Sequence, residues 1–108
     1  MNAIDDCIIT NSFDGKANPT GGIVNGTGLY IAWQHGPLGR GVRRKQPNGA
    51  FVETVIAAAI KRLEFYQLSR FACDDNEEAI IFLRRALCVL EMRTADRERR
   101  GVEGEHKV

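Results

Sequence analysis

The side chains best able to do chemistry lie near the two ends of the helical second half of the chain. Arg93 and Arg97 are four residues apart, so on a helix they project from one face about one turn apart. Two guanidinium groups placed in this way can bind phosphates, and the plane of an arginine can also stack on a nucleobase. Tyr66 and Asn76 supply a ring that stacks and an amide that recognises base edges. These residue types indicate a nucleotide ligand; ordinary core aromatics and surface arginines are the alternative.

The spacing between these groups sets a geometric condition on any shared ligand. Asn76 and Arg93 would lie about 25 Å apart on one helix, at 1.5 Å per residue. A small nucleotide cannot span that distance within one chain. If both ends serve one ligand, they must come from different protomers arranged antiparallel.

A second candidate is the glycine-rich basic connector that runs from His35 to Gly49. Its cations can close around a phosphate together with main-chain N–H groups. They are Arg40, Arg43, Arg44 and Lys45. The segment lacks the Gly-Lys-Ser/Thr ending of a P-loop. A solvated basic loop and a nucleic-acid-binding accessory protein both remain open as alternatives.

No catalytic or metal-binding set is visible in the sequence. The two histidines, His35 and His106, have no cysteine, serine or carboxylate at a recognisable catalytic spacing. A structural hydrogen bond is the expected role of His35. HExxH and CxxC motifs are absent, so we expect a protein without enzymatic activity, cofactor or metal.

Composition narrows the class further. The net charge is +1, so affinity for nucleic acid or membrane would have to come from a local patch. The longest apolar run, Val55 to Ile60, is far shorter than a membrane span. No signal peptide is visible, which favours a cytosolic protein. The cysteine count of three is odd, and we expect reduced, mostly buried thiols.

Two long helices must position the candidate residues. The apolar periodicity predicts one helix over 48–71 and a second over 74–99, joined only by Ala72 and Cys73. So short a link forces an antiparallel hairpin. Asp74 with Glu77 is expected to cap the second helix, and Gly101 to end it. The apolar stripes are wider than hairpin packing needs, so a neighbouring copy is expected to cover them.

The first third predicts a small antiparallel sheet that packs on a helix. We expect a strand over 7–10, a loop over 11–22 and a hairpin over 23–34, with its turn at Asn25-Gly26. The fold class is therefore α+β, in one oligomerising domain. Its parts are a β-rich, glycine-rich segment (1–47), the hairpin (48–100) and a tail (101–108).

Four segments carry a resemblance to a known family: GTGLYIAWQHGP, PNGAF, RLEFYQLSRFACDDNEEAI and LEMRTADRERRGVEG. Across about residues 20–104 the chain resembles the phage Thoeris anti-defence sponge proteins, which share a helical hairpin domain with the anti-CBASS sponges. The resemblance implies a non-enzymatic protein in the cytoplasm of the infected bacterial host. It would hold a cyclic ADP-ribose isomer intact at interfaces between protomers and so starve the immune effector. Some members are hexamers and also bind cyclic di- or trinucleotides of CBASS immunity; DNA and membrane partners are not implied.

The resemblance also assigns roles by motif position. Tyr66 would stack on a base, Asn76 would hydrogen-bond a base or ribose, and Arg93 with Arg97 would serve base stacking and the pyrophosphate. Arg40 would reach the phosphates, and Phe13 is the candidate contact of the N-terminal strand. The family pattern has phenylalanine where Tyr66 stands, so the hydroxyl could alter ligand preference. The second, cyclic-oligonucleotide site would fall near the chain end, at Arg99, Arg100, Gly101 and Gly104. A purely structural oligomer without ligand is the remaining alternative.

Overall fold

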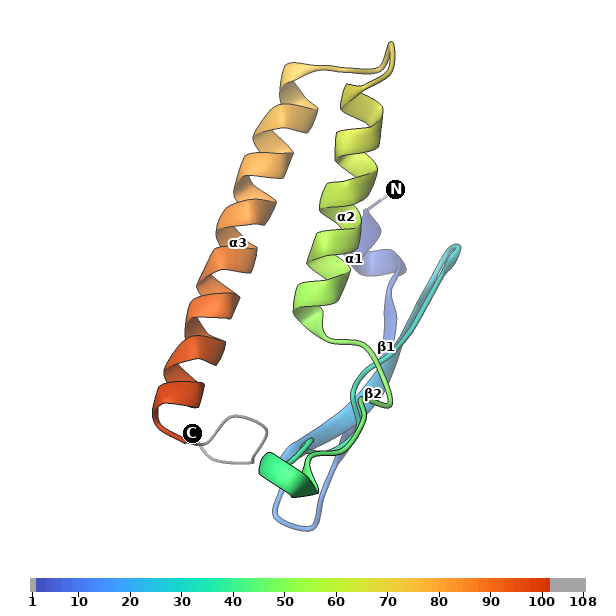
Figure 1. Ribbon diagram of the computed structural model, residues 1–108. Coiled ribbons are helices and arrows are strands. Elements are labelled where there is room, and N and C mark those ends of the chain that lie inside the picture. Colours follow the sequence, from blue (N-terminus) through green and yellow to red (C-terminus); the bar gives the residue numbers. More distant parts are fainter. Residues whose placement is uncertain (1, 102–108) are drawn as a thin grey trace. The chain divides into compact units, whose positions relative to one another are not determined.

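The structure, a computed structural model, describes residues 2–101. It divides into two compact units, one ending at Phe51 and the other running from Val52 to Gly101 (Figure 1). The first unit contains a three-stranded antiparallel sheet and the second contains two helices. The predicted α+β class is therefore confirmed, with the sheet ahead of the helical hairpin.

The sheet of the first unit has the strand order β1-β2-β3. Its strands are β1 (Ile8–Phe13), β2 (Pro19–Gly26) and β3 (Leu29–Ala32), which pair as antiparallel neighbours. A short helix, α1 (Ala3–Asp6), precedes the sheet, and its N-cap Asn2 accepts a hydrogen bond from the N–H of Ile4. A 3₁₀ helix, η1 (Gly41–Arg43), lies in the basic connector. Neither α1 nor η1 was predicted.

The predicted loop over 11–22 is wrong at both ends, because only residues 14–18 separate β1 from β2. The Asp14 carboxylate accepts hydrogen bonds from the N–H groups of Lys16 (2.7 Å) and Asn18 (3.0 Å). That bonding confines the turn to a few residues. Gly22 belongs to β2, where it pairs with Asn11, and a Cβ there would collide with the carbonyl oxygen of Thr10 across the ladder.

The hairpin turn also differs from the prediction. Gly26 pairs with Leu29, so the turn is Thr27-Gly28 rather than Asn25-Gly26. Gly28 has φ +70°, as the second position of such a tight turn requires. The Asp6 carboxylate accepts hydrogen bonds from the N–H (2.8 Å) and hydroxyl (3.2 Å) of Thr27. These hydrogen bonds from Thr27 to Asp6 stabilise the turn at Thr27-Gly28.

The connector returns alongside β3 and is fixed there by Asn48. The Asn48 side chain accepts the N–H of His35 (2.8 Å) and donates to its carbonyl oxygen (3.2 Å). His35 thus has the expected structural role, but its hydrogen bonds to Asn48 are made by its main-chain N–H and carbonyl groups. Trp33 forms a parallel bridge with Ala50, and Gly49 leaves no room for a Cβ against the Trp33 main chain. Residues 48–51 are held in this way, so the first long helix cannot begin at residue 48.

The second unit is an antiparallel pair of helices, α2 (Val52–Gln67) and α3 (Asp74–Arg99). The bounds of α3 are as predicted. The prediction for α2 is wrong by four residues at each end, and the link consists of residues 68–73 rather than two residues. Ser69 ends α2, since its hydroxyl and its N–H both donate to the Tyr66 carbonyl oxygen (2.6 and 3.0 Å).

The caps of α3 show one further difference. Cys73, not Asp74, is the N-cap, and its sulfur accepts the N–H of Asn76 at 3.4 Å. Gly101 follows the helix with φ +72°, which confirms it as the terminator.

The hairpin has a narrow core and a wide apolar exterior. Its buried side chains are Ile60 (4% exposed) and Ile80 (6%). Large apolar side chains remain exposed in the single chain, among them Leu68, Phe82, Val89 and Met92. The excess of apolar surface is therefore present, and its coverage by another copy stays a prediction. The three cysteines are free and all exposed, so the prediction of mostly buried thiols is wrong.

Candidate functional site

Tyr66 lies on an aromatic surface in the last turn of α2. Its hydroxyl accepts a hydrogen bond from Nε of Arg62 at 3.1 Å. The Arg62 guanidinium carbon lies 4.9 Å from the Tyr66 ring centre and 5.0 Å from that of Phe65, and the two ring centres are 6.1 Å apart. Cation and rings together can stack on a planar base. Arg62 was missed from sequence, although its spacing of four from Tyr66 places both on one helix face.

Asn76 has a different environment from the one expected. Its side-chain nitrogen donates to the Gln67 side-chain oxygen (3.1 Å) and to the Phe71 carbonyl oxygen (3.2 Å). Both amide hydrogens are therefore used to hold the link between the helices. Within residues 2–101 only Oδ1 of this amide lacks a hydrogen bond, so Asn76 can offer a ligand an acceptor but not a donor.

Gln67 is the residue that organises the link, and it was not singled out from sequence. Its oxygen accepts from the Cys73 N–H (3.0 Å) and from Asn76, while its nitrogen donates to the Cys73 carbonyl oxygen (3.1 Å) and to Glu77 (3.4 Å). Four hydrogen bonds satisfy the whole amide. They set the position of Asn76 relative to the end of α2.

Replacing Gln67 with alanine should lower the free energy of unfolding by about 1–2 kcal/mol, because four partly exposed hydrogen bonds are lost. Urea unfolding followed by the helical circular dichroism signal measures this. Gln46→Ala is the matched control: Gln46 is exposed and makes no hydrogen bond with the described residues, so about 0.5 kcal/mol or less is expected. Equal losses in the two variants would contradict the role assigned to Gln67.

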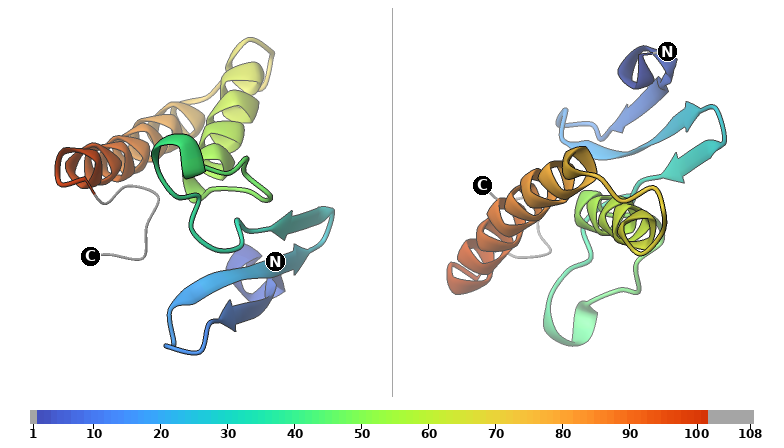
Figure 2. Two further views of the ribbon diagram at one scale, coloured as in Figure 1. Left: turned by 60° about the horizontal axis from the view of Figure 1, so that its bottom comes forward. Right: turned by 90° about the horizontal axis from the view of Figure 1, so that it is seen from above.

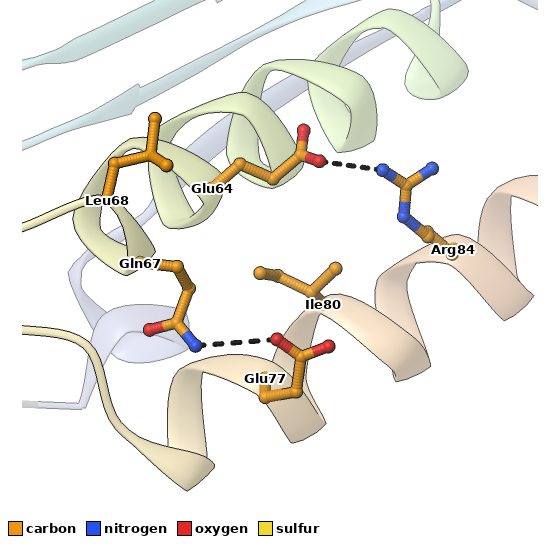
Figure 3. A pocket seen from close by; sticks show the side chains of 6 residues that line it. All are labelled: Glu64, Gln67, Leu68, Glu77, Ile80 and Arg84. Carbon is orange, nitrogen blue, oxygen red and sulfur yellow. Dashed lines mark hydrogen bonds and ion pairs between the residues drawn. The ribbon is translucent and has the colours of Figure 1, made fainter.

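A groove of about 420 Å³ lies between α2 and α3 near the link (Figure 3). It is lined by Glu64, Gln67, Leu68, Glu77, Ile80 and Arg84. Arg84 pairs with Glu64 at 2.8 Å, and Glu77 accepts the bond from Gln67. The groove therefore holds two carboxylates and a single arginine, which is already paired, so it does not suit a phosphate. None of the predicted ligand residues lines it.

The arginine pair lies at the far end of the hairpin. α3 is ten residues longer than α2, about 15 Å of helix, and it extends past the start of α2 (Figures 1 and 2). Arg93 and Arg97 lie in this extension. Arg93 is exposed and makes no hydrogen bond or ion pair with the described part of the chain, whereas Arg97 is half-buried and has an interaction partner.

Two of the residues predicted for a second nucleotide site already contact a carboxylate, that of Asp96. Arg99 and Arg100 pair with Asp96 at 3.2 and 3.0 Å. Gly101 is the left-handed residue after α3, and Gly104 lies outside the described residues. A second anion bound here would have to compete with Asp96.

The remaining predicted contacts belong to the first unit. Arg40 is exposed and precedes η1, and Phe13 ends β1 with 62% of its surface exposed. Within one hairpin the structure therefore gathers two groups, Tyr66 with Asn76 at the link and Arg93 with Arg97 at the other end. Since Asn76 and Arg93 are on one continuous helix, the predicted separation of about 25 Å holds.

Residues 2–101 contain neither a cluster of three or more potential metal ligands nor a helix long and apolar enough to cross a membrane.

Comparison with known proteins gives one informative match. The sequence matches no family model. Over 77 residues, 71% of this chain, it is 44% identical to a protein of Bacillus phage SBSphiJ7 named Thoeris anti-defense 1. The matched region covers 51% of that relative, so the chain spans about half the relative's length.

Proposed function

The chain belongs to the Thoeris anti-defence family, and from this premise we propose that it is a phage anti-defence protein that binds a cyclic ADP-ribose isomer and keeps it intact. The name of the phage relative is the observation that carries the anti-defence role. By holding the signal molecule, the protein would lower its free concentration in the infected cell and so keep the immune effector inactive.

The chemistry of the hairpin supports a ligand with bases and phosphates. Tyr66, Phe65 and Arg62 form a cationic aromatic surface for stacking, and Oδ1 of Asn76, in the first turn of α3, is an acceptor at the same end of the hairpin. Arg93 and Arg97 carry two positive charges one turn apart for a pyrophosphate. A net charge of +1 suits a localised site for a small dianion better than a surface for duplex DNA.

The separation of the two groups determines how the site would be assembled. Because about 25 Å of rigid helix lies between them, one small ligand would contact the aromatic end of one protomer and the arginine end of another. Binding would then require an oligomer, for which a hexamer is the expected form. Arg40 and Phe13 are the proposed additional contacts, and Arg99 with Arg100 the proposed site for a cyclic oligonucleotide.

Release after denaturation tests the proposal directly. The protein is incubated with a panel of cyclic ADP-ribose isomers, freed of unbound ligand, heated, and the supernatant analysed by mass spectrometry. We expect one isomer to be recovered unmodified at a fixed ratio to protein, since no catalytic group has been assigned. Recovery of a hydrolysed product would indicate an enzyme instead. A bovine albumin sample of equal mass controls for carry-over.

A further inference from the structure

We propose that β1 pairs edge to edge, antiparallel, with β1 of a second copy of this chain. β1 is at one edge of the sheet, and β2 is its only substantial neighbour among the described elements. The inference depends only on the first unit and is independent of the nucleotide proposed above. If it fails, the ligand site on α2 and α3 is unaffected.

The hydrogen bonds of β2 show which side of β1 is unpaired. The carbonyl oxygen of Gly22 accepts the N–H of Trp33 (2.9 Å), and that of Thr20 accepts the N–H of Gly36 (2.6 Å), on the side of β2 away from β1. Main-chain groups alternate along an antiparallel strand. In the regular part of the ladder, Gly21, Ile23 and Asn25 therefore turn their main-chain groups toward β1. Past the irregularity, the N–H of Asp14 donates to the carbonyl oxygen of Asn18 (3.0 Å), so Asp14 also faces β2.

The pairing of β1 with β2 shows which β1 residues face β2. Asn25, Ile23 and Gly21 are opposite Ile8, Thr10 and Ser12, so the main-chain groups of these three β1 residues face β2. The skipped position at the irregularity is Thr20, on β2, so β1 itself stays regular. The outward N–H and C=O groups are consequently those of Ile9, Asn11 and Phe13. No hydrogen bond from elsewhere in residues 2–101 reaches them.

β1 lacks the features by which sheet edges are normally protected. Its sequence, IITNSF, contains no charged residue and no proline. Ile8, Ile9 and Phe13 are 71%, 60% and 62% exposed. An uncharged, apolar edge of six residues is a template for another strand.

The partner that the edge fits is its own copy. Antiparallel pairing of β1 with itself brings no like charges together, because the strand has none. With the two-fold axis at Asn11, Ile9 lies opposite Phe13 of the second copy, and all three outward residues form bonded pairs. Ile9 and Phe13 are on one face, so an aromatic ring meets a β-branched side chain twice. This pairing places the exposed ring of Phe13 in the interface between the two copies.

Disulfide trapping tests the register. In a background with Cys7, Cys73 and Cys88 changed to serine, Asn11→Cys is placed opposite itself across the axis. The Cα atoms of a bonded pair are about 5.5 Å apart, within the range that a disulfide spans. We expect Asn11→Cys to form a covalent dimer under mild oxidation at least tenfold faster than Asn25→Cys. Asn25 is the matched control, an exposed asparagine on the central strand. Equal rates would overturn the proposal.

Solution mass tests the pairing itself. Asn11→Pro removes only an outward N–H, so β1 and β2 stay paired while the edge is blocked. Light scattering should give a mass at most half that of the unsubstituted chain, with an unchanged circular dichroism spectrum. Asn11→Lys, which places two like charges opposite each other, should do the same more strongly at low salt. A monomeric unsubstituted chain, or folded variants with undiminished mass, would overturn the proposal.

Discussion

Replacing Arg93 with alanine is expected to weaken binding of the cyclic ADP-ribose isomer about 10- to 100-fold, because a charge-assisted hydrogen bond is lost. Arg93 makes no polar contact with the described residues, so its removal should cost the fold little. Arg97→Ala should reduce binding at least as much. Titration calorimetry with the isomer recovered in the release experiment measures the effect.

Arg85→Ala is the matched control for Arg93→Ala. Arg85 is an exposed arginine on the same helix, but unlike Arg93 it has no second arginine four residues away. It should bind the isomer within about twofold of the unsubstituted protein, which is within the scatter of surface substitutions. The solution mass of all three variants should be unchanged. Normal binding by both Arg93→Ala and Arg97→Ala would show that the arginine end is not the ligand site.

The second large effect is expected in the core of the hairpin. Ile80→Ala should lower the free energy of unfolding by about 2–4 kcal/mol, because a side chain only 6% exposed is truncated between two helices and leaves a cavity. Figure 3 shows Ile80 directed from α3 toward α2 beside the groove. Urea unfolding at one fixed protein concentration measures the loss.

Ile81 provides a control that differs only in burial. It is the next residue on α3, has the same side chain, and is 50% exposed. Ile81→Ala should change the free energy of unfolding by less than about 1 kcal/mol, since less apolar surface is lost and alanine favours helix. Similar losses for the two variants would show that Ile80 is not the residue that holds α2 against α3.

The elements predicted best from sequence are those fixed by neighbouring residues. The bounds of α3 follow from its apolar periodicity and from Gly101, both readable locally. α2 was predicted too long because its limits depend on distant contacts, Ala50 with Trp33 at one end and Gln67 with Cys73 at the other. The turn at Thr27 was missed for the same reason, since its partner Asp6 is 21 residues away.

In the candidate site too, the features predicted correctly are those set by nearby residues. The placement of Arg93 and Arg97 follows from their spacing of four on one helix, and the structure has both residues on α3 as expected. The role of Asn76 could not be foreseen, because its partners Gln67 and Phe71 meet it only through the folded link. The contact of Arg62 with Tyr66 was predictable, because the two residues are four apart on one helix, but Arg62 was not identified from the sequence.

The unequal lengths of the two helices have an evolutionary consequence. The last turns of α3 extend beyond α2, so the exposed Arg93 is not part of the packing between the two helices. Substitutions there should carry little cost in folding, whereas substitutions near Ile80 or Gln67 would be removed by selection for a stable fold. With the proposed ligand site at this end, phage lineages could change its charge and shape as host signals diversify, while the packed part of the hairpin stays the same.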